Sequence, residues 1–224
     1  QFVTEYLPWR EIVVWLSVVA IFAGVVMAWS QTSVKKMLTY LVVAEIGYMV
    51  GGIWLCNLNG TGGAILHILN DAMMTFCLFL AVGAVVYKTG GHTLDHFNGL
   101  YRRMPWTMAG FTVAGMAMIG VPPTCGFFSK WFLIRGAIDA GHWGFFAALI
   151  GSSLVIAVLV FRVIERAYYH EPIYGLESAG AVNEAPLSMT APLITVAVWL
   201  ILLGLAAGDI SIVIERFLIT AGIS

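Results

Sequence analysis

Residues 106–139 read WTMAGFTVAGMAMIGVPPTCGFFSKWFLIRGAID, an apolar stretch that a Gly-Val-Pro-Pro sequence interrupts at its centre. A helix that crosses about 30 Å of hydrocarbon needs about 20 apolar residues, so this stretch is too long for one ordinary span. Adjacent prolines remove two backbone donors and disfavour helical geometry at the preceding valine, while nearby glycines relieve crowding. The stretch therefore predicts two half-helices that meet near residues 120–125, with the break formed by Gly120, Pro122, Pro123 and Gly126.

The composition of the whole chain fits a membrane environment. Its 224 residues are 60% hydrophobic and 10% charged, with a mean hydropathy of +0.91. A soluble domain carries about 25% charged residues because water must wet its surface, so a water-soluble enzyme is excluded. The net charge of −1 offers no basic face for nucleic acid. The chain is therefore interpreted as an integral membrane protein in contact with the lipid bilayer.

The apolar runs predict an all-α fold, a polytopic transmembrane helix bundle with about six crossings, one of them broken. A single membrane domain covers residues 1–224, and its expected spans are 12–30, 37–56, 64–87, 106–139 (broken at 120–125), 143–161 and 187–208. Segment 209–221 alternates apolar and polar residues, which predicts an interfacial helix.

Loop charges favour one crossing by the broken stretch. With one crossing, one side of the membrane carries seven basic residues: Lys35, Lys36, Lys88, Arg102, Arg103, Arg162 and Arg166. The other side then carries only Arg10 and Arg216, whereas two separate crossings would divide these residues six against three. Cytoplasmic loops carry the excess of Lys and Arg. Both ends of the chain are therefore expected on the non-cytoplasmic side.

Four ionisable residues fall inside the expected spans: Glu45, His67, Asp71 and Lys130. A charged group at the centre of a membrane helix costs about 2.5–3.5 kcal/mol, so such residues are rarely idle. At about 1.5 Å per residue, Glu45 lies about 12 Å inside its helix, Asp71 about 10 Å and Lys130 about 13 Å. These three are therefore expected near the midplane.

Two interpretations of this set remain open. The residues either hold helices together through buried hydrogen bonds and an ion pair, or form a proton or cation relay. His67, Asp71 and Thr75 are spaced four apart and make one polar stripe on their helix. Lys130 follows the break by one or two turns, with Asp71 or Glu45 expected as its carboxylate partner. Burial lowers the pKa of a lysine and a nearby carboxylate raises it. A lysine subject to both effects is expected to exchange a proton near neutral pH.

Other chemistry has little support. His92, Asp95 and His96 lie in a glycine-containing loop without a supporting cysteine, which favours a solvated loop over a metal site. Cys56, Cys77 and Cys125 lie in apolar runs as small buried hydrophobic residues. No nucleotide-binding, haem-attachment or serine-nucleophile pattern occurs. We therefore expect no metal, no cofactor and no catalytic site belonging to this chain alone.

Three stretches resemble the antiporter-like subunits, which are the proton-pumping membrane subunits of respiratory complex I, their hydrogenase relatives and the D subunit of Mrp-type cation/proton antiporters. SQTSVKKMLTYLVVAEIGYMVGG at 30–52 and ILHILNDAMMTFCLFLAVGAV at 65–85 resemble two helices of that family. The most specific match is RRMPWTMAGFTVAGMAMIGVPPTCGFFSKWFLI at 102–134, which is similar to the family's R-M-P and G-x-P-P-x-x-G-F-x-[SG]-K string.

The resemblance assigns roles residue by residue. Lys130 matches the family's essential lysine on a broken helix, and His67 matches the first histidine of its relay helix. Asp71 stands where the family usually has a second histidine, and Thr75 where it usually has a lysine. Glu45 occupies a position that is more often Gln or His. The implied relay is therefore chemically altered.

The resemblance covers only the second of the family's two inverted five-helix repeats, plus the last helix. It implies either a fragment or a chain whose missing first repeat comes from another polypeptide. The function implied is a proton- or cation-translocating membrane subunit that works with other membrane subunits in a bacterial inner membrane or an equivalent coupling membrane. Two alternatives remain open: a non-conducting structural subunit, and an accessory subunit that couples cation flux to uptake of an inorganic substrate.

Overall fold

The computed structural model describes residues 7–171 and 183–220, and within them the chain is almost entirely helical. The helices are α2 (Leu7–Trp29), α3 (Val34–Trp54), α4 (Leu58–Thr89), α5 (Leu100–Arg103), α6 (Pro105–Ile119), α7 (Cys125–Asp139), α8 (Trp143–Tyr169), α9 (Leu187–Leu205) and α10 (Ala207–Thr220), with a 3₁₀ helix at Leu94–Phe97. The predicted all-α class is confirmed. In the described ranges, extended backbone pairs only at the isolated bridge between Ser33 and Thr93.

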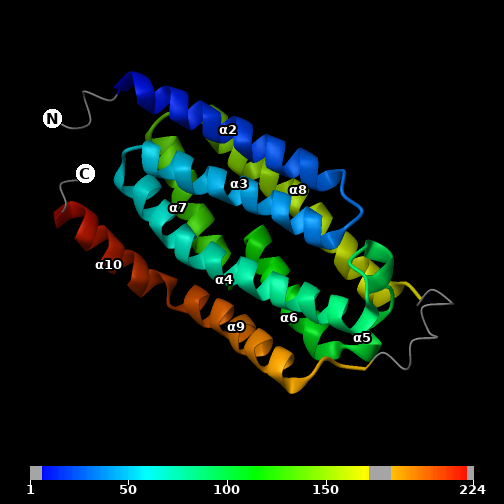
Figure 1. Ribbon diagram of the computed structural model, residues 1–224. Helices are drawn as coiled ribbons and strands as arrows, with labels where there is room; N and C mark the ends of the chain where they lie inside the picture. The colour runs from blue at the N-terminus through cyan, green and yellow to red at the C-terminus, as the bar shows by residue number, and fades with distance from the viewer. Residues whose placement is uncertain (1–6, 172–182, 221–224) are drawn as a thin grey trace.

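The long helix α4 lies at the centre of the bundle. It packs against α3 on one side, against α6 and α7 on another, and against α9 and α10 on the third, while α2 and α8 complete the layer beyond α3 (Figure 1). Gly47 lets α3 approach α2 closely, because a Cβ at this position would lie 2.7 Å from Ile21 Cγ1. Small residues at helix contacts are the usual device for close packing in a bilayer.

The broken stretch makes one crossing, as predicted. Helix α6 begins at the end of the bundle where α8 finishes, and α7 finishes where α4 begins (Figure 1). Asn57, which caps α4, donates through Nδ2 to the carbonyl of Gly136 in α7 at 2.7 Å, and Asn59 donates to Asp139 at 2.6 Å. The two half-helices together therefore run antiparallel to the whole length of α4.

The described parts of the chain contain five helices long and apolar enough to cross a membrane, namely α2, α3, α4, α8 and α9. With the broken pair they make six candidate crossings, the number expected, and α10 continues the course of the last one. Most of these helices extend beyond the apolar runs. Helix α8, for example, continues to Tyr169 and includes the polar Arg162, Glu165 and Arg166. Hydropathy marks only the part in hydrocarbon, whereas backbone hydrogen bonds continue into the interface.

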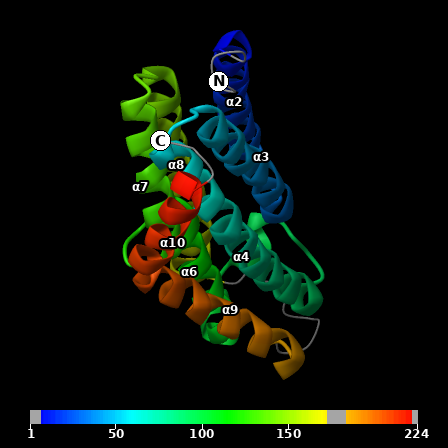
Figure 2. The same cartoon turned by 90° about the vertical axis from the view of Figure 1, so that its left-hand side faces the viewer.

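The last two helices pack against the break and against α4. Gly204, near the end of α9, packs against Pro123 and Thr124 at the break, so α9 ends at the level where α6 and α7 meet. Helix α10 then continues along the first half of α4, where Ile214 and Leu218 approach Gly62. Figures 1 and 2 both show α10 following α9 along the bundle. Helix α10 covers most of the segment 209–221 that was predicted as an interfacial helix, and its place relative to a membrane surface stays a prediction.

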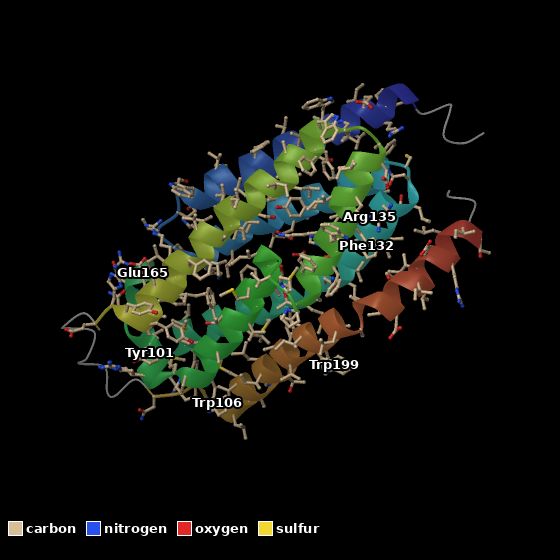
Figure 3. All side chains as sticks on the ribbon, turned by 180° about the vertical axis from the view of Figure 1, so that it is seen from behind. Tyr101, Trp106, Phe132, Arg135, Glu165 and Trp199 are labelled. Carbon is tan, nitrogen blue, oxygen red and sulfur yellow. The ribbon has the colours of Figure 1, made fainter. Side chains whose placement is uncertain are left out.

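The two ends of the bundle carry different connections. Figure 3 shows Tyr101, Trp106 and Glu165 near one end, and Phe132 and Arg135 of α7 toward the other. The first end holds the loops that contain most of the basic residues. There Arg166 pairs with Asp95 at 3.3 Å, so the segment around His92 and His96 is docked on α8.

Candidate functional site

Three of the four predicted ionisable residues meet at the helix break. Glu45 comes from α3, His67 from α4 and Lys130 from the second turn of α7. Glu45 and His67 have no exposed surface, and the Lys130 side chain is 7% exposed. Three helices that are distant in sequence thus place one acid, one imidazole and one amine in a single buried cluster.

Glu45 is the residue that joins the other two. Its Oε2 lies 2.8 Å from His67 Nε2, and its Oε1 lies 3.4 Å from Lys130 Nζ. An ionised carboxylate only accepts hydrogen bonds, so both contacts require a proton on the partner nitrogen. The pairing answers a question that the sequence left open, because Glu45 and not Asp71 contacts the lysine.

The ammonium of Lys130 has a closer partner in the main chain. Lys130 Nζ donates to the carbonyl oxygen of Met118, at the end of α6, at 2.6 Å. A buried charge is tolerated when it is both paired and hydrogen-bonded. The lysine therefore joins α7 to α6 across the break, in addition to its contact with α3.

The break itself makes this carbonyl available. Gly120, with φ of 92°, ends α6, and the amides of Gly120 and Val121 both return to Met116. In a continuing helix the carbonyl of Met118 would accept from the amide four residues later. That residue is Pro122, which has no N–H. The proline pair thus leaves an acceptor inside the membrane that Lys130 satisfies.

Ser129 extends the cluster on the other side of His67. Its Oγ lies 2.9 Å from His67 Nδ1 and 3.2 Å from the carbonyl of Gly126. The hydroxyl can donate to a neutral Nδ1, or accept from a protonated Nδ1 while donating to Gly126. The same serine therefore satisfies both protonation states of the histidine.

Tyr48 covers the cluster from α3. The centre of its fully buried ring lies 5.0 Å from Lys130 Nζ and 5.5 Å from the centre of the His67 ring. Its hydroxyl bonds to Ser152 of α8 at 2.6 Å, and Ser152 also donates to the carbonyl of Ala148. The Tyr48 ring is thus held by the backbone of α3 at one end and by the hydrogen bond to α8 at the other.

Asp71 lies beside the cluster without a direct hydrogen bond to it. Its carboxylate accepts from Thr75 in the same helix at 3.1 Å, and Asp71 interacts electrostatically with Glu45, His67 and Lys130. Asn70 points elsewhere and donates to the carbonyl of Cys125 at the start of α7. Of the polar stripe predicted on α4, His67 therefore belongs to the hydrogen-bonded cluster, whereas Asp71 and Thr75 lie beside it.

Sequence reasoning missed three participants: Tyr48, Ser129 and the carbonyl of Met118. Tyr48 is three residues after Glu45, so helical spacing places both on one face and could have revealed it. Ser129 precedes Lys130 directly and carried no signal beyond its neighbour. The Met118 carbonyl was implied by the proline four residues later, although nothing indicated which donor would reach it.

The arrangement is suited to moving a proton rather than to cleaving a bond. Lys130, Glu45, His67 and Ser129 form an unbroken series of donor and acceptor atoms across three helices. Among the described residues, no group of three or more His, Cys, Asp or Glu side chains could hold a metal ion. The fold and the site together define a polytopic membrane protein whose buried titratable groups meet at a broken helix.

The chain belongs to the NADH:quinone oxidoreductase/Mrp antiporter transmembrane family, whose model matches residues 2–156. It is 38% identical over 211 residues to NADH-quinone oxidoreductase subunit N of Desulforudis audaxviator strain MP104C, an alignment that covers 88% of this chain and 41% of that protein. The chain thus spans less than half the length of this relative.

Solved structures have the same fold. One chain of the membrane-bound sulfane sulfur reductase, an archaeal respiratory membrane complex, superposes with a TM-score of 0.84 at 25% identity, covering 94% of this chain and 42% of that one. One chain of the Mrp complex from Dietzia sp. DQ12-45-1b superposes with a TM-score of 0.80 at 22% identity, covering 90% and 45%. The predicted family resemblance is confirmed.

Proposed function

We propose that this chain is a proton- or cation-translocating part of a larger membrane complex, of the complex I, hydrogenase or Mrp antiporter kind. The observation that carries the proposal is the continuous series from Lys130 through Glu45 to His67 and Ser129 at the break. Each neighbouring pair lies within 3.4 Å, and every side-chain group in it can lose or accept a proton. Membership of the family supports the same function.

In the proposed relay, Lys130 releases a proton to Glu45, and the protonated Glu45 passes it to Nε2 of His67 when the neutral imidazole carries its own proton on Nδ1 instead of Nε2. The imidazole then releases a different proton from Nδ1 through the Ser129 hydroxyl, because its two nitrogens act independently. Asp71 lies beside this series, at a position of α4 where the resemblance implies a second histidine in the family. It would take part through water, or by its electrostatic effect on Glu45.

Other membrane subunits are part of the proposal. The chain spans 41% of its relative from Desulforudis audaxviator, and we propose that another chain or segment supplies the missing first repeat. Asp71 is 6% exposed and accepts from Thr75, so the proposal of a further chain rests on the share of the relative that this chain covers and not on an uncovered polar group. A bacterial inner membrane, or an equivalent coupling membrane, is the proposed location.

One observation favours a second candidate, a non-conducting structural subunit. Thr75 stands where the family usually has a lysine, and it bonds only to Asp71 in its own helix. In that case, Glu45 and Lys130 would be a buried ion pair that holds α3 against α7.

Two substitutions of Lys130 separate the candidates when transport and yield of the purified complex are both measured. Lys130→Met removes the titrating amine. Lys130→Arg keeps a positive charge, because a guanidinium does not release its proton near neutral pH. A relay predicts that both variants lose ion-coupled activity and that the Met variant, which leaves Glu45 without its cation, assembles with a lowered melting temperature. Full activity in the Arg variant together with failed assembly in the Met variant would overturn the relay.

A further inference from the structure

Lys130 has two neighbours that the proposed relay does not use, the carbonyl of Met118 and the ring of Tyr48. Its ammonium lies 2.6 Å from a neutral main-chain carbonyl, but 3.4 Å from the charged carboxylate of Glu45. Glu45 in turn lies closer to His67, at 2.8 Å, than to the lysine. The ammonium therefore makes its shortest contact with an uncharged group, and the carboxylate makes its shortest contact with the histidine.

Tyr48 supplies the second uncharged group. A cation within about 6 Å of an aromatic centroid is attracted by the ring's electron density, and the attraction grows when water is excluded. Lys130 Nζ is 5.0 Å from the Tyr48 centroid, and both side chains are buried. The ring and the Met118 carbonyl together contact the ammonium from α3 and α6.

We propose that Tyr48 is a positioning residue for Lys130: with the Met118 carbonyl it forms a neutral cradle that holds the protonated amine beside Glu45 rather than against it. The lysine thereby has two positions, one in the cradle and one on the carboxylate. In the cradle, Lys130 contacts only Oε1 of Glu45, at 3.4 Å, and leaves Oε2 to bond with His67. This inference rests on the proposed relay for its effect on transport, but not for its effect on stability.

The hydroxyl of Tyr48 makes a separate contact, away from Lys130. It bonds to Ser152 of α8, and Ser152 keeps its own acceptors at Ala148 and Leu149. Tyr48→Phe therefore removes one hydrogen bond but retains the aromatic face. Tyr48→Leu removes the face and keeps an apolar side chain of moderate size.

The experiment compares Tyr48→Phe, Tyr48→Leu and a matched control in the intact purified complex. The control is Phe111→Leu in α6, which removes an equally buried ring that packs against Phe97 instead of the lysine. Tyr48→Leu is expected to lower the transport rate about tenfold, because a desolvated cation–π contact is worth about that factor. Tyr48→Phe and Phe111→Leu are expected to stay within about threefold of the parent protein.

A second measurement separates positioning from ordinary packing. Thermal stability is compared for Tyr48→Leu, Lys130→Met and the double variant. If the ring acts on the ammonium, the loss caused by Tyr48→Leu shrinks when Lys130 is already Met. Equal losses in both backgrounds, or equal transport by Tyr48→Leu and Phe111→Leu, would overturn the proposal. A parent complex that moves no ion would refute the proposed function, while the stability comparison would still decide the role of Tyr48.

Discussion

The ammonium of Lys130 and the main-chain carbonyl of Met118 face each other across the helix break, 2.6 Å apart. The contact joins two half-helices that share no continuous backbone hydrogen bonding, and the carbonyl is open to the lysine because α6 ends at Gly120 and Pro122 has no N–H. The interruption in the helix and the buried charge are therefore parts of one arrangement, since each satisfies a group that the other would leave exposed to hydrocarbon.

Glu45→Gln is expected to destabilise the complex and to stop transport. The amide cannot carry the negative charge that faces Lys130, and loss of one member of a buried ion pair costs about 3–5 kcal/mol. In the double variant with Lys130→Met, the stability loss should be smaller than the sum of the single losses. Melting temperatures of the four purified complexes test this, and strictly additive losses would contradict a direct pairing.

Ser129→Ala should slow transport by about three- to tenfold without reducing the yield of complex, because one hydrogen bond to His67 Nδ1 is lost. The matched control is Ser17→Ala in α2, a buried serine that donates only to the carbonyl of Val13 in its own helix. Both variants are compared in proteoliposomes under the same ion gradient. Equal transport rates in the two variants would mean that proton transfer does not pass through Nδ1 of His67.

Gly136→Ala should be among the most damaging small substitutions in the chain. A Cβ at Gly136 would collide with the backbone of Gly60 at the start of α4, where Asn57 also bonds to the Gly136 carbonyl. Overpacking of this kind costs about 1–3 kcal/mol. Gly83→Ala, where a Cβ meets nothing within 4 Å, should be neutral or stabilising by up to about 1 kcal/mol. Thermal melting of the two variants provides the comparison.

Gly204→Ala tests the course of α9 and α10. Its Cβ would collide with the carbonyl of Pro123 and with Thr124, which would force α9 away from the break. Gly208→Ala, four residues later, adds a methyl group where no atom lies within 4 Å. We expect a lower melting temperature and lower transport only for Gly204→Ala. Matching behaviour would mean that α9 does not pack at the break.

Much of the fold could be predicted from the sequence because the bilayer imposes strong rules. The position of the break followed from Gly120 and the proline pair, and the single crossing followed from the distribution of basic residues. The contact of α10 with α4 did not follow from the sequence, because an alternating apolar pattern is equally suited to a lipid surface and to the flank of another helix. Helix ends were also missed, since polar residues such as Arg166 extend a helix beyond its hydrophobic part.

The candidate site was predictable in its members but not in its contacts. Glu45, His67 and Lys130 were identifiable because ionisable residues are costly in a membrane. Depth along the helix could not decide between Glu45 and Asp71 as partner of the lysine, because both lie near the midplane. That choice depends on the rotation of α3 and α4 about their axes, which is fixed by packing across the whole bundle.

The Met118 carbonyl has a consequence for how this site can vary. Any amino acid at position 118 presents the same oxygen, so the lysine's closest partner does not depend on the chemistry of that side chain, which is constrained only by its packing in the core. The constraint falls instead on residues that make no polar contact with the ammonium. Gly120 ends the helix with its φ of 92°, and Pro122 has no N–H that could donate to the Met118 oxygen. A search for functional positions based on polar side chains would overlook both, although the chemistry at Lys130 depends on them.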